Sequence, residues 1–131
     1  MRKFLIAGVL ATALLPAQAM AQVAFNGTWK ADPSTTMSYK VDGDTVMMTT
    51  PTGQSYTAKV DGTDAPYMGD PNITSVSLMM LSDNTLVESD KRDGATVSVH
   101  TMKITPDGKT IAISVRDKMS GTMTKLVASR Q

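Results

Sequence analysis

The stretch "AFNGTWKAD", Ala24 to Asp32, contains the one tryptophan of this 131-residue chain. Trp29 stands two residues after Gly27, just beyond an apolar leader and at the start of the first expected strand. A large aromatic ring near the start of a strand mainly contributes to packing. We therefore interpret Trp29 first as a residue of the fold, and the rest of the sequence indicates which fold.

Residues 1–21 have the pattern of a secretory signal peptide. A positively charged start precedes the apolar run "FLIAGVLATALL", Phe4 to Leu15, and small residues follow. The run is shorter than the roughly 20 apolar residues of a membrane-spanning helix. Cleavage after Ala19 or after Ala21 fits the small-x-small rule, and we prefer Ala21. We expect one mature domain over 22–131 and a periplasmic or secreted location, with an uncleaved anchor as the competing interpretation.

The charge balance and the cysteine content restrict the class of protein. The leader carries two of the 13 basic residues and none of the 12 acidic ones, so the remainder has 11 against 12 and a formal net charge of −1. This near-neutral balance argues against nucleic acid or an anionic membrane as a partner. The chain has no cysteine, although many secreted domains rely on disulfides. Closure of the fold and packing must therefore stabilise it.

Turn signals divide the mature sequence into short segments of strand length. Four Asp-Gly pairs, the strongest short hairpin signal, stand at Asp42-Gly43, Asp61-Gly62, Asp93-Gly94 and Asp107-Gly108. The segments between turn signals are about five to nine residues long. We expect strands at about 27–31, 36–41, 45–50, 54–60, 65–69, 74–81, 85–90, 95–104, 109–116 and 122–129.

Several segments alternate with a period of two, which indicates a sheet with one apolar face. "TSVSLMML" places Val76, Leu78 and Met80 together, and "KTIAISVR" does the same for Ile111, Ile113 and Val115. In "ATVSVHT", we expect Val97 and Val99 to face the core and His100 to face solvent.

Consecutive hairpins predict an antiparallel meander, whose unpaired edges are its main liability. Closing the sheet on itself removes those edges without disulfides. The predicted fold is therefore all-β, a meander of about 8–10 short strands closed into a barrel. A β-sandwich is the alternative, although it would need longer crossover connections than the sequence offers.

The opening stretch resembles the first strand of the lipocalin and fatty-acid-binding-protein superfamily, which carries a Gly-x-Trp motif, here Gly27-Thr28-Trp29. In that superfamily an arginine at the last strand packs across the indole, and "KLVASRQ" places Arg130 there. The resemblance implies a lipocalin-like barrel closed by Gly27, Trp29 and Arg130. A guanidinium over an indole contributes about 0.5–2 kcal/mol. The chain is also similar to small secreted bacterial proteins of lipocalin-like type.

The resemblance implies a non-enzymatic barrel that binds a small apolar or amphipathic ligand in its interior. The candidate interior residues are Val46, Met48, Leu78 and Met80. The chain departs from fatty-acid-binding proteins, because it has no room for their helical lid and no Arg and Tyr set to clamp a carboxylate. The alternative is a protein-interaction module, of the secreted protease or lysozyme inhibitor type or an envelope structural factor. It would act through rim loops such as 49–57 and 63–72.

The sequence offers little for catalysis. It contains one histidine, His100, no cysteine and no Gly-x-Ser-x-Gly elbow, and most acidic residues stand in turns. We therefore predict no enzymatic activity, no cofactor and no catalytic residue.

Methionine is unusually frequent, with nine residues after the leader. Thioether clusters can bind Cu(I) outside the cytoplasm, which makes Met-based copper binding a remote alternative. The pairs Met47-Met48 and Met79-Met80 argue against it, because adjacent residues of a strand point to opposite faces. We interpret the methionines as filling an irregular interior, and we predict no metal.

Overall fold

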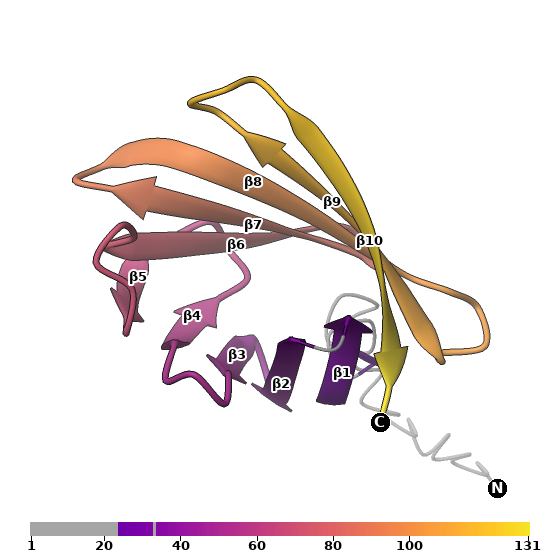
Figure 1. Ribbon diagram of the computed structural model, residues 1–131. Coiled ribbons are helices and arrows are strands. Elements are labelled where there is room, and N and C mark those ends of the chain that lie inside the picture. The colour runs from indigo at the N-terminus through magenta and orange to yellow at the C-terminus, as the bar shows by residue number, and fades with distance from the viewer. Residues whose placement is uncertain (1–23, 33) are drawn as a thin grey trace, which may run out of the picture.

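The computed structural model describes residues 24–32 and 34–131, so the expected signal peptide, 1–21, lies outside the described residues. Ten strands follow one another along the chain (Figure 1). They are β1 (Gly27–Asp32), β2 (Thr35–Asp42), β3 (Thr45–Thr49), β4 (Ser55–Lys59), β5 (Ala65–Met68), β6 (Ser75–Ser82), β7 (Thr85–Arg92), β8 (Ala95–Ile104), β9 (Thr110–Asp117) and β10 (Met123–Arg130).

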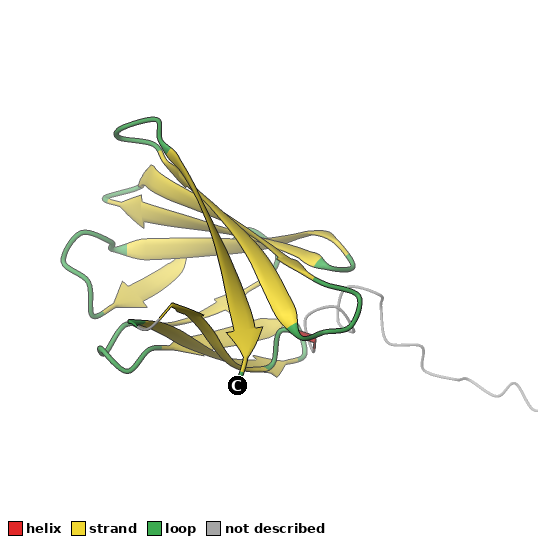
Figure 2. Cartoon of the chain, turned by 45° about the vertical axis from the view of Figure 1, so that its right-hand side comes forward, coloured by secondary structure: helices red, strands yellow, loops and turns green. Residues whose placement is uncertain are grey.

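Each strand pairs antiparallel with the next one along the chain, and β1 pairs with β10 to close the barrel. The predicted meander barrel is confirmed and the β-sandwich alternative is wrong. All ten strands begin and end within two residues of the expected bounds. Figure 2 shows that loops and turns join strands throughout the barrel. Among the described residues, the structure contains no helix long and apolar enough to cross a membrane.

The four Asp-Gly pairs lie at strand ends or in the connections between strands, and Asp93-Gly94 forms a two-residue hairpin turn. Asp93 and Gly94, between β7 and β8, have φ angles of 50° and 85°. Two successive positive φ angles are the signature of the tight turn that matches the twist of a hairpin. The connections leave the barrel at two ends. We call the end with the β2–β3, β4–β5, β6–β7 and β8–β9 turns the basal end, and the other the distal end.

Trp29 is completely buried, with its indole under the guanidinium of Arg130. The guanidinium carbon lies 4.2 Å from the centroid of the Trp29 ring, and the two residues are direct partners across the β1–β10 pair. The indole N–H donates to the carbonyl of Phe25 at 2.9 Å, so its polar atom is satisfied inside the core.

Arg130 also binds three carbonyl groups of two other segments through its N–H groups. It donates to the carbonyl of Asn26 at 2.6 Å, to that of Ala24 at 2.8 Å and to that of Gly108 at 3.0 Å. These contacts hold the chain before β1 and the β8–β9 turn against the end of β10. The arginine therefore fixes the basal end by charge-assisted hydrogen bonds as well as by its cation–π contact.

Gly27 gives this guanidinium the space it occupies. A side-chain carbon at Gly27 would lie 2.8 Å from Nη1 of Arg130. The residue also has a φ of 127°, which side-chain-bearing residues rarely adopt. Glycine at this place in the Gly-x-Trp sequence is therefore required by both backbone and packing.

The β1–β10 pair is short, and this shapes the interior. Its register contains only Trp29 opposite Arg130 and Lys30 opposite Ser129, although β10 begins at Met123. Figures 1 and 2 show the β9–β10 hairpin standing away from β1 and β2. The barrel is thus held tightly at its basal end and spreads toward its distal end.

Alternation divides the methionine pairs as expected. Met48 and Met80 are buried at 4% and 7% exposure, whereas Met47 and Met79 are 44% and 47% exposed. The buried members belong to one apolar core cluster that also contains Trp29. Methionine therefore fills part of this interior, and each adjacent pair divides between the core and the surface.

The basal contacts predict a measurable coupling. Trp29→Phe and Arg130→Met should each lower the free energy of unfolding, and the double variant should lose less than the sum of the two. The expected coupling is about 0.5–2 kcal/mol, the range for a cation–π pair. Urea unfolding of the four proteins measures it. A matched cycle of Trp29→Phe with Lys30→Met should give no coupling, and additive losses in the first cycle would contradict the assignment.

Candidate functional site

A polar row lies on the inner wall of the barrel, where strands β7 and β8 meet. Glu88 and Asp90 are only 6% and 3% exposed, and they alternate along β7 with less buried neighbours. In the register, Glu88 stands opposite His100 and Asp90 stands opposite Ser98. Directly paired residues share one face of a sheet, so all four side chains point inward. We call Glu88, Asp90, Ser98 and His100 the interior polar cluster.

The expectation that His100 faces solvent is wrong. His100 shares its face of β8 with Met102 and Ile104, which are 1% and 5% exposed, and with Glu88 across the pair. Val97 and Val99 therefore lie on the outer face. Apolarity indicated the wrong face here, because the wall at the distal end is polar inside and partly apolar outside.

The hydrogen-bonding atoms of the cluster lie close together. Nε2 of His100 is 3.2 Å from Oδ2 of Asp90 and 3.2 Å from Oγ of Ser98. The Ser98 hydroxyl donates to the same Asp90 oxygen at 3.4 Å. On the other side of the ring, Nδ1 lies 3.8 Å from Oε2 of Glu88. One imidazole thus stands between two carboxylates.

Burial and the neighbouring charges together favour the protonated form of Glu88, and the two carboxylates favour that of His100. Burial raises the pKa of Glu88 to about 7, and the charge of Asp90 adds to this effect, while His100 opposes it. Burial alone would lower the pKa of His100, but the hydrogen bond with Asp90 and the charges of Glu88 and Asp90 outweigh it. The pKa of His100 therefore lies above its ordinary value.

Three tyrosines add hydroxyl groups to this interior. Tyr39 and Tyr56 are 4% and 2% exposed, and Tyr67 is half-buried beside Tyr56, with ring centroids 5.8 Å apart. Burial raises the pKa of all three well above the ordinary value, and Glu88 is the next largest cause for each. Tyr39 directs its hydroxyl to the sulfur of Met102 at 3.5 Å. All three phenols are neutral near pH 7.

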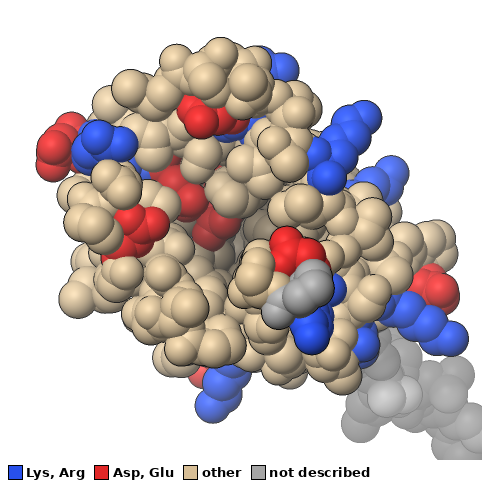
Figure 3. Space-filling model, in the orientation of Figure 1, with Lys and Arg blue, Asp and Glu red and all other residues tan. Residues whose placement is uncertain are grey.

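Two buried polar atoms in this region have no hydrogen-bond partner among the described residues. They are the Tyr56 hydroxyl and Oδ1 of Asp90. An unsatisfied buried polar atom costs about 1–3 kcal/mol, so a folded protein keeps such atoms where something else satisfies them. Figure 3 shows a hollow in the face of the molecule, with acidic side chains recessed inside it.

The candidate interior residues all lie in the core, and two of them adjoin the polar region. Leu78 stands directly opposite Glu88, and Met48 stands directly opposite Tyr56. Val46 and Met80 pair with Ala58 and Leu86 farther toward the basal end. The inner wall therefore carries apolar and polar surfaces side by side. Gly27, Trp29 and Arg130 lie at the basal end, as described above.

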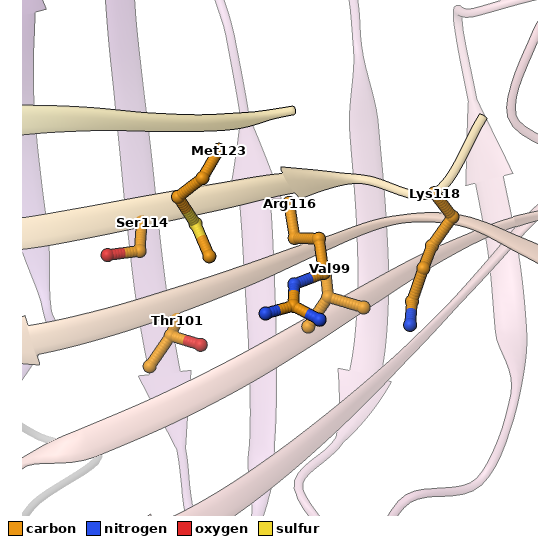
Figure 4. Close-up of a pocket in the computed structure, with 6 residues that line it drawn as sticks. All are labelled: Val99, Thr101, Ser114, Arg116, Lys118 and Met123. Atoms are coloured by element: carbon orange, nitrogen blue, oxygen red, sulfur yellow. The ribbon is translucent and has the colours of Figure 1, made fainter. Parts of the chain in front are cut away.

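A separate pocket lies on the outer face of β8, β9 and β10 (Figure 4). Its lining consists of Val99, Thr101, Ser114, Arg116, Lys118 and Met123. Ser114 and Arg116 alternate with the buried Ile113, which places this pocket outside the barrel. It is therefore distinct from the interior polar cluster.

The order Ser98, His100, Glu88 resembles the order of a nucleophile, a base and an orienting acid. Asp90, however, lies as close to Nε2 as Ser98 does, and it competes for the proton that the base would take from the hydroxyl. The geometry suits the binding of a hydrogen-bond donor or a cation better than nucleophilic attack.

The comparisons with known proteins do not assign a function to this site, so the assignment rests on its geometry. No family model matches this chain, and no curated protein matches it either.

The cluster predicts that stability decreases as the pH rises. The folded chain holds protons on Glu88 and His100 at pH values where the unfolded chain has released them. The stabilisation is complete below the unfolded pKa of Glu88 and is lost as the pH passes through about 7 and above. Melting temperatures of the EDTA-treated protein should therefore fall from pH 5 to pH 8. Glu88→Gln should flatten this profile and the exposed-site control Asp64→Asn should not. An unchanged slope in Glu88→Gln would contradict the assignment.

Proposed function

We propose that this protein is a non-enzymatic, lipocalin-like binding barrel, periplasmic or secreted, that holds a small amphipathic ligand in its interior. The observation that carries the proposal is the buried Oδ1 of Asp90, which has no partner among the described residues and lies on the inner wall. A ligand with a hydrogen-bond donor would satisfy it, and the Tyr56 hydroxyl offers a second polar contact.

The surrounding surface fits the apolar part of such a ligand. Leu78 and Met48 are the direct neighbours of Glu88 and Tyr56 in the register, so apolar and polar walls meet at this level. Methionine side chains adapt to different shapes, which suits a ligand with a flexible apolar body. The hollow with recessed acidic side chains in Figure 3 offers the ligand an entrance.

The lipocalin-like character rests on the basal end. The Gly-x-Trp sequence stands in the first strand, and the arginine of the last strand covers its indole. Such a barrel has a closed floor and leaves the opposite end for the ligand. Trp29 therefore has a structural role in this proposal, and the ligand binds nearer the distal end.

An outer-face depression favours protein interaction as a second candidate function. Met47 and Met68 are 44% and 60% exposed, and together with Pro66 they line a hollow on the outside of β3, β4 and β5. Exposed apolar side chains that gather on neighbouring strands are typical of contact surfaces. A secreted inhibitor or an envelope factor would use such a surface.

A neutral fluorophore tests the interior site. N-phenyl-1-naphthylamine joins an apolar naphthalene and an apolar phenyl group through one N–H donor, and its fluorescence rises in an apolar environment. We expect saturable binding in the presence of EDTA. Val115→Trp should abolish it, because Val115 packs on the core next to His100 in the register. The matched control Ser114→Trp adds the same side chain to the outer face and should bind normally.

Absence of binding in the folded wild-type protein would contradict the proposal, as would equal binding by both tryptophan variants. Native mass spectrometry of the protein purified from its own envelope fraction then separates the two candidate functions. A bound small molecule supports the interior site, and a bound protein lost on Met68→Glu supports the outer face.

A further inference from the structure

We propose that the interior polar cluster is a binding site for one divalent transition-metal ion of the zinc type, held by Asp90, Ser98 and His100 and oriented by Glu88. The site goes beyond the amphipathic ligand and does not depend on it. It uses Oδ2 of Asp90, whereas that ligand would use Oδ1.

The three donor atoms form a compact triangle. The edges are 3.2 Å from Nε2 of His100 to Oδ2 of Asp90, 3.2 Å from Nε2 to Oγ of Ser98, and 3.4 Å from Oγ to Oδ2. Zinc binds nitrogen and oxygen ligands at about 2.0–2.2 Å. Ligands at that distance, arranged at tetrahedral or octahedral angles, are about 3–3.5 Å apart. The triangle therefore matches one face of a coordination shell with little rearrangement.

Glu88 occupies the place of an orienting partner. Its Oε2 lies 3.8 Å from Nδ1, the ring nitrogen of His100 that does not face the triangle. A metal-binding histidine usually donates its other N–H to a carboxylate, which fixes the tautomer and the ring orientation. At 3.8 Å, Nδ1 and Oε2 are beyond hydrogen-bond distance, so the proposal requires the two groups to move closer when the metal binds. Nδ1–H would then donate to Glu88 and leave the lone pair of Nε2 free for the metal. The ligand atoms of Glu88, Asp90 and His100 all lie within 4.8 Å of one another.

The buried carboxylate of Asp90 is only partly satisfied, which favours a cation beside it. Asp90 is only 3% exposed, yet its Oδ1 has no hydrogen-bond partner among the described residues. Metal binding requires deprotonated ligands, so a divalent ion would displace the proton of the imidazole and take its place as the positive partner of Asp90.

The donor set selects the class of metal. Imidazole nitrogen with carboxylate oxygen suits zinc and its neighbours, whereas calcium and magnesium prefer shells of oxygen alone. Cu(I) favours soft sulfur ligands. The sulfur of Met102, on the same face of β8 as His100, accepts a hydrogen bond from the Tyr39 hydroxyl at 3.5 Å. The Met-based copper alternative would thus use a different set of residues from this site.

His100 provides a direct test, because it is the only histidine of the chain. The full-length protein, prepared without a polyhistidine tag and treated with EDTA, is titrated with Zn²⁺ alone. Isothermal titration should give one site per chain. The imidazole ¹⁵N spectrum should show Nε2 changing from its free to its metal-bound shift, with Nδ1 remaining protonated. A wild-type imidazole spectrum that does not change at saturating Zn²⁺ overturns the proposal without any variant.

Substitutions then rank the four residues by their contribution to Zn²⁺ affinity. His100→Gln should cause the largest loss of Zn²⁺ affinity, and Ser98→Ala the smallest, because a hydroxyl is a weak neutral ligand. Glu88→Gln should weaken binding by about 10–100-fold, as outer partners of metal ligands do. The control Asp64→Asn removes an exposed carboxylate that pairs with Lys91 and should leave Zn²⁺ affinity unchanged. Undiminished binding by folded His100→Gln overturns the site.

The test separates this site from the proposed ligand. Fluorophore binding in EDTA with no Zn²⁺ binding leaves the amphipathic ligand supported and overturns the metal. Zn²⁺ binding at His100 without fluorophore binding supports the metal site and overturns the amphipathic ligand. Ser98→Ala is the second variant if His100→Gln fails to fold, because it removes one hydroxyl and keeps the buried charges paired. Its Zn²⁺ affinity should fall below that of the wild type, and an unchanged affinity contradicts the triangle.

Discussion

The seam between the first and last strands is the constraint on which the rest of this barrel depends. A ten-strand meander without cysteines must join its two edges, and β1 and β10 share only two register pairs. Arg130 reinforces this short seam by covering Trp29 and by binding three carbonyls at the basal end. Since the reinforcement is confined to that end, β10 diverges from β1 toward the other, and the barrel has a fixed floor and a wider distal half.

The interior divides in the same way. Around Trp29 the side chains are apolar and the polar indole atom is satisfied by Phe25. Farther along, two acids, a histidine and three tyrosines share one enclosed region, and two of their atoms are unpartnered. Apolar residues of similar size would stabilise such a wall as well or better. Polar atoms kept at this cost are typical of binding sites, which is the physical reason to assign function to the distal half.

The fold could be predicted from the sequence because its signals are local. Asp-Gly turns mark the hairpins, and alternation marks the strands, so all ten strands were located within two residues. The Gly27 and Trp29 positions also carried a recognisable motif. The site could not be located in the same way. Apolar residues identify the inner face of a strand only where the inside of the barrel is apolar, and here the inner face is polar. Val97 and Val99 indicated the wrong face of β8. Alternation over the whole length of each strand indicates the correct face. His100 alternates in step with the buried Met102 and Ile104 on β8, and Glu88 and Asp90 alternate in step with the buried Leu86 on β7. The Asp93-Gly94 turn specifies Arg92 opposite Ala95, but an irregularity between Asp90 and Lys91 then shifts the β7–β8 register. That shift places Glu88 opposite His100, and no local signal in the sequence marks it.

The central claim is that the distal interior is a cation-binding site built around an inward-facing histidine. The most direct measurement is a crystal structure of the protein grown with Zn²⁺, with diffraction data collected on both sides of the zinc absorption edge. The account predicts one strong anomalous peak inside the barrel, at about 2.0–2.2 Å from Nε2 of His100 and from a carboxylate oxygen of Asp90. A histidine ring on the outer face beside Val99, or zinc peaks confined to surface carboxylates, would contradict it.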